Sequence, residues 1–288
     1  MANYTTADIK ALREKTGAGM LDVKKALDEA DGDAEKAIEI IRVKGLKGIA
    51  KREGRAASAG LIAAKVVDSA DGTDGADSGE GQVGVLVEIN AETDFVAKNE
   101  KFIDFAAKVL DAAVASGAET AEALAEVEVD GSTVKELTDS MQAVIGEKIV
   151  VRRVARLVAP RVETYLHRTN PDLPAQVGVL VGTDAKAAEA AHDVAMHIAA
   201  YSPLYLTRED VPAEVVDKER AIAEETTRAE GKPEKAIPRI VEGRLGGYFK
   251  ENCLVDQAYA KDPKTTVDKV VKATGGKLTG FVRFRVGA

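Results

Sequence analysis

The chain has 288 residues, of which 45% are hydrophobic and 31% charged, and a formal net charge of −8. This composition is typical of a globular protein of two or three small domains, and the negative charge argues against nucleic acid as the main partner. No apolar run approaches the roughly 20 residues that a membrane span needs. The single cysteine, Cys253, and the absence of a secretory signal favour a cytoplasmic location.

Residues 1–45 are predicted to form a domain of three short helices. A threonine at 5 or 6 can cap the first helix, a Gly-Ala-Gly turn at 17–19 separates it from the second, and Asp33 can cap the third. Apolar side chains recur at the spacing of one helix face, at Met20, Val23, Leu27, Ala37, Ile38 and Ile41. Helices this short bury little surface, so we expect the domain to bind another protein.

The connector at 46–58 lies within a basic stretch. Residues 42–55 contain six Lys and Arg side chains of the connector and the preceding helix against a single acid, Glu53. The simpler interpretation is a solvated helical linker, and the alternative is contact with an acidic partner surface.

Two identical segments mark the core of the chain. Residues 82–87 and 176–181 both have the sequence QVGVLV and lie 94 residues apart. Each is apolar and rich in valine, which predicts a buried strand, and each is followed by an Ala-rich amphipathic helix. We therefore expect an α+β fold with a duplicated core and antiparallel sheets, the first subdomain at 59–147 and the second at 148–211 and 250–288.

The remaining core elements follow from periodicity and turn residues. Strands are expected at 59–67, 82–90, 148–158, 163–167, 176–181 and 277–286. Helices are expected from Asn99 onward and at 133–146, 185–200 and 265–273. The acidic segment at 68–81 is expected to form a loop, and it lacks the residue order of a calcium-binding loop.

Residues 212–249 are predicted to form a projecting helical hairpin. Pro212 can open the first helix, and Gly231-Lys232-Pro233 turns the chain. A second helix then places Ile237, Val241 and Leu245 on one face, with Pro238 expected to kink or restart it.

Catalytic and metal-binding patterns are scarce in this sequence. It has no P-loop and no Gly-x-Ser-x-Gly elbow. His192 and His197 are separated by about 140° around a helix, so they cannot form a helical metal pair. Cys253 has no nearby partner in sequence and is expected to be buried. We therefore expect no enzyme activity and no cofactor or metal, although a small-molecule enzyme using Glu92, Asp94 and His197 stays as a hypothesis.

The two copies of the duplicated strand continue differently. The first runs through Glu92 into Thr93-Asp94-Phe95-Val96, whereas the second goes directly into its helix. Phe95 can either fold into its own core or be held outward as an aromatic anchor for a partner, with Thr93 and Asp94 stiffening the turn.

Several segments of this chain resemble the bacterial elongation factor Ts family. They are residues 16–27 (TGAGMLDVKKAL), 93–98 (TDFVAK), 195–200 (AMHIAA), 241–244 (VEGR) and 280–284 (GFVRF), and they occur in the family's order. The resemblance spans nearly the whole chain, from about residue 7 to 287. Longer members of the family continue into a C-terminal helical module.

The resemblance implies a guanine nucleotide exchange factor for the GTPase elongation factor Tu, without direct nucleotide binding. By family motif, the tetrapeptide would insert into the partner's GTPase domain, where Asp94 and Phe95 would disturb the Mg²⁺ and phosphate side of its nucleotide site and Thr93 and Val96 would frame them. The resemblance further implies a UBA-like N-terminal bundle, contacts from Leu12, Met20, Leu21 and His197, and a coiled-coil or dimerisation arm at 212–249.

An alternative function is an RNA-binding translation accessory protein. Its candidate residues are the basic side chains between Arg42 and Arg55 and between Arg152 and Arg156. This alternative predicts an RNA affinity that falls steeply with salt.

Overall fold

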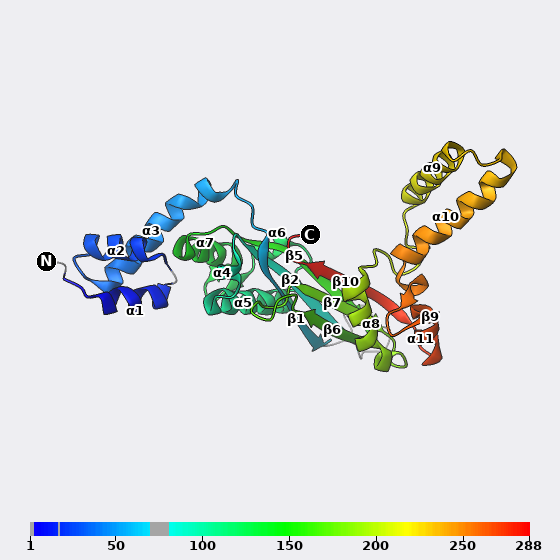
Figure 1. The fold of residues 1–288 in the computed structure, drawn as a ribbon. Coiled ribbons are helices and arrows are strands. Elements are labelled where there is room, and N and C mark those ends of the chain that lie inside the picture. Colours follow the sequence, from blue (N-terminus) through cyan, green and yellow to red (C-terminus); the bar gives the residue numbers. More distant parts are fainter. Residues whose placement is uncertain (1–2, 17, 70–80) are drawn as a thin grey trace.

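The computed structural model describes residues 3–16, 18–69 and 81–288, which Figure 1 shows running from a helical bundle through two sheets to a pair of projecting helices. The expected acidic loop at 68–81 falls largely outside the described residues, as does Gly17. Within the described part, no helix is both long and apolar enough to cross a membrane. The combination of helices with antiparallel strands confirms the predicted α+β class.

The N-terminal bundle consists of α1 (Thr6–Thr16), α2 (Met20–Glu29) and α3 (Ala34–Arg52). Asp33 caps α3 by accepting hydrogen bonds from the backbone N–H groups of Glu35 and Lys36, at 3.0 and 3.1 Å. The core of the bundle contains Leu12, Ala18, Val23, Ala26, Leu27, Ala37 and Ile41. Because α3 has 19 residues, it also includes most of the basic stretch at 42–55.

Two three-stranded antiparallel sheets form the centre of the molecule. The first has the order β1-β2-β5, with strands Ala59–Asp68, Gln82–Ala91 and Ile149–Ala159. The second has the order β10-β7-β6, in which β6 is Arg161–His167, β7 is Val177–Thr183 and β10 is Leu278–Arg285. The duplicated segments therefore lie in β2 and β7, the central strand of each sheet.

Helices pack on one face of each sheet. The first sheet is covered by α4 (Asp94–Ala97), α5 (Glu100–Ser116), α6 (Ala121–Ala125) and α7 (Val134–Ile145). The second is covered by α8 (Ala188–Tyr201) and α11 (Val267–Ala273). Short ladders join β3 (Glu128–Val129) to β4 (Ser132–Thr133) and β8 (Ala258–Tyr259) to β9 (Asp262–Thr266). The valines of the duplicated strands face these helices.

The other faces of the two sheets pack against each other through reciprocal Gly and Leu positions. A Cβ atom placed on Gly84 would lie 2.9 Å from a methyl group of Leu180, and one placed on Gly178 would lie 3.1 Å from a methyl group of Leu86. Both leucines are fully buried. Glycine in each copy thus makes room for the leucine of the other copy, which gives a packing reason for the repeated sequence.

We call the part of the core built on the first sheet the first half and the part built on the second sheet the second half. Two helices, α9 (Ala213–Ala229) and α10 (Ile237–Asn252), pack along each other and project from the second half (Figure 1). Pro238 is the second residue of α10, which follows the 3₁₀ turn η1 (Glu234–Ala236). In the first turn of a helix the backbone N–H has no partner within the helix, so the N–H that proline lacks is not missed there. Pro238 therefore lies in the first turn of this helix and does not kink it. At the base, Arg208 forms two hydrogen bonds with Asp256, at 2.7 and 3.0 Å.

Candidate functional site

The tetrapeptide after β2 forms the single helical turn α4. The Thr93 side chain caps this turn by accepting a hydrogen bond from the N–H of Val96, at 3.4 Å. Val96 and Ala97 are buried at 7% and 0% exposure and anchor the turn to the core. Asp94 and Phe95 face outward, and Phe95 is 78% exposed.

Glu147, which comes after α7, holds the backbone just before this turn. One of its carboxylate oxygens accepts a hydrogen bond from the N–H of Thr93 at 3.0 Å, and the other accepts one from the Thr93 hydroxyl at 2.8 Å. Hydrogen bonds to a charged carboxylate are stronger than neutral ones, so Thr93 is held from two sides. Sequence reasoning missed Glu147, because this residue lies 54 positions away from Thr93.

A second acidic side chain reinforces the same region. Glu92 accepts a hydrogen bond from the N–H of Lys148 at 2.7 Å, and Arg55 donates to the same carboxylate at 3.2 Å. The two residues that follow β2, Glu92 and Thr93, are therefore tied to the two residues that precede β5.

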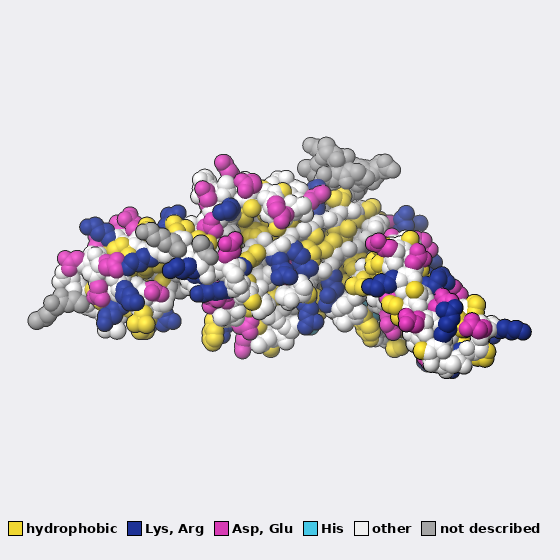
Figure 2. Space-filling view, turned by 90° about the horizontal axis from the view of Figure 1, so that it is seen from above, with side chains coloured by type: hydrophobic (Ala, Val, Ile, Leu, Met, Phe, Trp, Pro, Cys, Tyr) yellow, Lys and Arg dark blue, Asp and Glu magenta, His cyan; other side chains and the backbone are white. Residues whose placement is uncertain are grey.

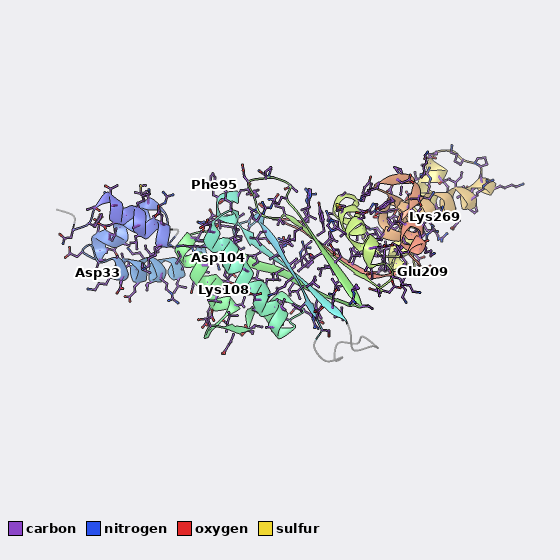
Figure 3. The ribbon with its side chains drawn as sticks, turned by 90° about the horizontal axis from the view of Figure 1, so that it is seen from below. Asp33, Phe95, Asp104, Lys108, Glu209 and Lys269 are labelled. Carbon is purple, nitrogen blue, oxygen red and sulfur yellow. The ribbon has the colours of Figure 1, made fainter. Side chains whose placement is uncertain are left out.

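The phenyl ring of Phe95 makes few contacts with its own molecule. The ammonium group of Lys98 lies 5.0 Å from the ring centroid, an exposed cation–π contact of modest strength. Figure 3 places Phe95 at the margin of the first half of the molecule. Burying a Phe side chain is favourable by about 1.5–3 kcal/mol, and this ring has left most of that free energy unused. Such a ring suits insertion into a partner.

The predicted N-terminal residues occupy two different environments. Met20 and Leu21, in the first turn of α2, are 59% and 71% exposed. Leu12 is 3% exposed and lies in the core of the bundle. Two adjacent apolar side chains are thus available at the surface, and Leu12 supports the helices that carry them.

His197 lies inside the second half, with 1% exposure. Its Nε2 is 2.8 Å from the side-chain oxygen of Gln257, and its Nδ1 accepts a hydrogen bond from the N–H of Ala260 at 3.2 Å. Since Gln257 uses its amide nitrogen to donate to a carbonyl, its oxygen faces the ring, so the imidazole is neutral and protonated on Nε2. Burial lowers the pKa of His197.

Tyr201, which the sequence did not single out, stacks on His197 and is itself exposed. The ring of Tyr201 stacks on His197 with centroids 4.6 Å apart and 7° between the planes, and Tyr201 is 53% exposed. Leu204, just after α8, is 64% exposed. A histidine without direct access to solvent thus supports an exposed tyrosine.

The side chains of the hypothetical small-molecule enzyme do not form a common site. Glu92 and Asp94 come after β2 in the first half, whereas His197 belongs to α8 and is enclosed by partners of the second half. Among the described residues, no three His, Cys, Asp or Glu side chains are grouped so as to hold a metal ion. Cys253 is fully buried, as predicted, and burial raises the pKa of its thiol to about 11.

A clamped turn that displays an aromatic ring, on a scaffold with further exposed apolar side chains, defines a protein of the partner-binding class. A family model described as Elongation factor TS matches residues 92–288 of the chain. Proteins named Elongation factor Ts from Beutenbergia cavernae, Micrococcus luteus and Renibacterium salmoninarum are 66%, 62% and 61% identical, over the full length of both chains in each case.

The chain therefore belongs to the elongation factor Ts family, as the motifs predicted. Its class is that of a translation elongation factor, and the family implies nucleotide exchange on elongation factor Tu instead of enzymatic catalysis in the usual sense.

Proposed function

We propose that this chain releases GDP from elongation factor Tu by inserting Phe95, with Asp94 beside it, into the partner's GTPase domain. The observation that carries the proposal is the 78% exposure of Phe95 on a turn that is anchored by buried Val96 and clamped by Glu147. Thr93 and Val96 then frame the inserted pair without entering the partner themselves.

The mechanism is a reciprocal coupling between two ligands of one GTPase. GDP is held by Mg²⁺ and by backbone N–H groups around its phosphates. A protein that stabilises a distorted form of the Mg²⁺ and phosphate side weakens GDP, and GDP weakens that protein by the same factor. The exchange factor needs no nucleotide site of its own, because it acts only on the partner's conformation.

Three other regions are assigned supporting roles in this proposal. Met20 and Leu21 of the UBA-like N-terminal bundle form a second contact, with Leu12 holding their helix. His197 contributes a third contact by orienting Tyr201. The pair α9–α10 forms a coiled-coil or dimerisation arm, and the site of action is the cytoplasm, where translation takes place.

The test is the rate of GDP release from elongation factor Tu, measured by stopped flow with a fluorescent GDP. We expect Phe95→Ala to slow the catalysed release by tenfold or more, which corresponds to about 1.4 kcal/mol in the barrier. The matched control is Leu166→Ala, which removes a 41% exposed apolar side chain outside the proposed contacts and should leave the rate unchanged. A Phe95→Ala protein that folds normally and exchanges at the parent rate would refute the insertion mechanism.

Among the described residues, no observation favours the RNA-binding alternative. Three of its candidate side chains make internal contacts: Arg55 with Glu92, Arg152 with the carbonyl of Ala288, and Arg153 with Glu88. Figure 2 also shows acidic and basic side chains mixed over the N-terminal bundle and the projecting helices. A salt titration of RNA binding remains the direct check.

A further inference from the structure

The C-terminal end of α7 and the three residues after it, 142–148, contact both the bundle that carries Met20 and Leu21 and the turn that carries Phe95. We call this segment the α7 junction. On one side it contacts α3 of the N-terminal bundle, and on the other it contacts the α4 turn that carries Phe95.

The bundle side of the junction is a contact between two backbones. A Cβ atom placed on Gly45 of α3 would lie 2.0 Å from the carbonyl oxygen of Ala143 and 2.4 Å from its carbonyl carbon. Since the clash is with main-chain atoms, no change of rotamer can relieve it. The two helices can approach this closely only because residue 45 has no side chain.

An arginine of the basic stretch completes this contact. Arg52 donates a hydrogen bond to the carbonyl of Gln142 at 3.1 Å, in the last turn of α7. A cation at the carboxyl end of a helix is favoured by the helix dipole. This arginine, predicted from sequence to belong to a solvated linker, is instead bound to the end of another helix.

The opposite side of the junction holds the α4 turn. Glu147 binds Thr93 through both carboxylate oxygens, and the N–H of Lys148 binds Glu92. The ammonium group of Lys148 also reaches back to the carbonyls of Glu53 and Arg55, at the end of the connector. Seven consecutive residues therefore bind both the bundle and the Phe95 turn.

We propose that Gly45, Arg52 and Glu147 are positioning residues, which hold Met20 and Leu21 at a fixed distance from Phe95 so that both regions bind the partner as one surface. This inference rests on the proposed function, because it takes both regions as partner contacts. Its physical advantage is that a docked bundle has already lost the orientational freedom that a loosely tethered one would lose on binding.

The first test measures geometry in the free protein. Spin labels are placed on Glu39→Cys in the bundle and Glu122→Cys in the core, both exposed positions. The native Cys253 should remain unlabelled because it is fully buried. We expect Gly45→Ala to broaden the distance distribution between the labels. Gly54→Ala adds the same methyl group where no atom lies within 4 Å, so it should leave the distribution narrow. An equally narrow distribution in Gly45→Ala would overturn the inference.

The second test measures affinity for nucleotide-free elongation factor Tu by calorimetry. In the parent, we expect Met20→Ala combined with Leu21→Ala to weaken binding by about tenfold. In the Gly45→Ala background, the same pair should weaken it by about twofold or less, since a loosely tethered bundle contributes less. Equal losses in both backgrounds, or no loss in the parent, would overturn the inference.

The two proposals fail in different ways. If Phe95→Ala leaves GDP release unchanged, the insertion mechanism fails whatever the spin labels report. If Phe95→Ala slows release while Gly45→Ala keeps both the parent geometry and the full effect of the Met20 and Leu21 substitutions, only the positioning role fails. Far-UV circular dichroism checks that Gly45→Ala keeps its helices, as Ala in a helix favours.

Discussion

The two halves of the core share one strand sequence and differ in the loop that comes after it. In the first half, β2 leads into a turn whose polar groups are bound by Glu147 and whose Phe95 points outward. In the second, β7 leads to Asp184, which caps the next segment by accepting a hydrogen bond from the N–H of Ala187 at 3.0 Å. The repeated part is the packing unit, and the unshared loop carries the candidate function.

The same contrast applies to the aromatic side chains near each repeat. Phe95 in the first half is largely exposed, whereas His197 in the second is buried and stacks with both Tyr201 and Tyr259. The exposure of the Phe95 ring is therefore a property of the α4 turn, since Val96 and Ala97 beside it are buried.

The largest expected effect tests the equivalence of the two repeats. Leu86→Ala and Leu180→Ala should each lower the free energy of unfolding by about 2–5 kcal/mol, because each removes a fully buried side chain from the contact between the sheets. Urea titration monitored by circular dichroism measures both. If only one of the two substitutions lowered the free energy of unfolding, the two repeats would not contribute equally to the contact between the sheets.

A smaller effect sharpens the difference between the two loops. Glu147→Gln keeps the size of the side chain but cannot accept two hydrogen bonds from Thr93 in the same way, so we expect a loss of about 1–2 kcal/mol in stability. GDP release should also slow, by about threefold to tenfold, or about 0.7–1.4 kcal/mol in the barrier, because a less firmly held turn positions Phe95 less well. Glu122→Gln, at an exposed position, is the control. An unchanged rate of GDP release in Glu147→Gln would mean that the two hydrogen bonds from Thr93 to Glu147 are not needed for exchange.

The smallest effect concerns pH and the second half alone. Burial lowers the pKa of His197 from its usual value of 6.5, so the unfolded chain binds the proton more readily than the folded one. Stability from this group is therefore fully present above pH 6.5 and is lost as the pH falls below it. His197→Gln should reduce the fall in melting temperature between pH 7 and pH 5. A fall of the same size in both proteins would assign it to other groups.

Hydrophobic periodicity and turn residues predicted most helices and strands, because these elements depend mainly on residues close together in the sequence. The duplicated strands, the helix after Asn99 and the start of α9 just after Pro212 all agree with such patterns. The full length of α3 was harder to predict, since its last turns are stabilised by α7 and not by an apolar stripe of their own.

The environments of individual site residues depended on contacts that no local pattern contains. The exposure of Phe95 was one of two possibilities, and the structure shows the ring exposed, which the local sequence alone does not indicate. Leu12 and His197 lie in cores, which the family resemblance alone does not indicate. The roles of Gly45 and Glu147 arise from residues 98 and 54 positions away, Ala143 and Thr93 respectively.

The exchange of Gly and Leu between the sheets has a consequence for any attempt to dissect the molecule. A fragment that ended after the first half would leave Ile62 and Leu86 without the residues that cover them, and the second half alone would expose Val162 and Leu180. Cutting the chain between the halves would therefore expose an apolar face on each fragment. A bulkier residue at 84 would need space from both Val162 and Leu180, so a change in one repeat is constrained by side chains of the other half.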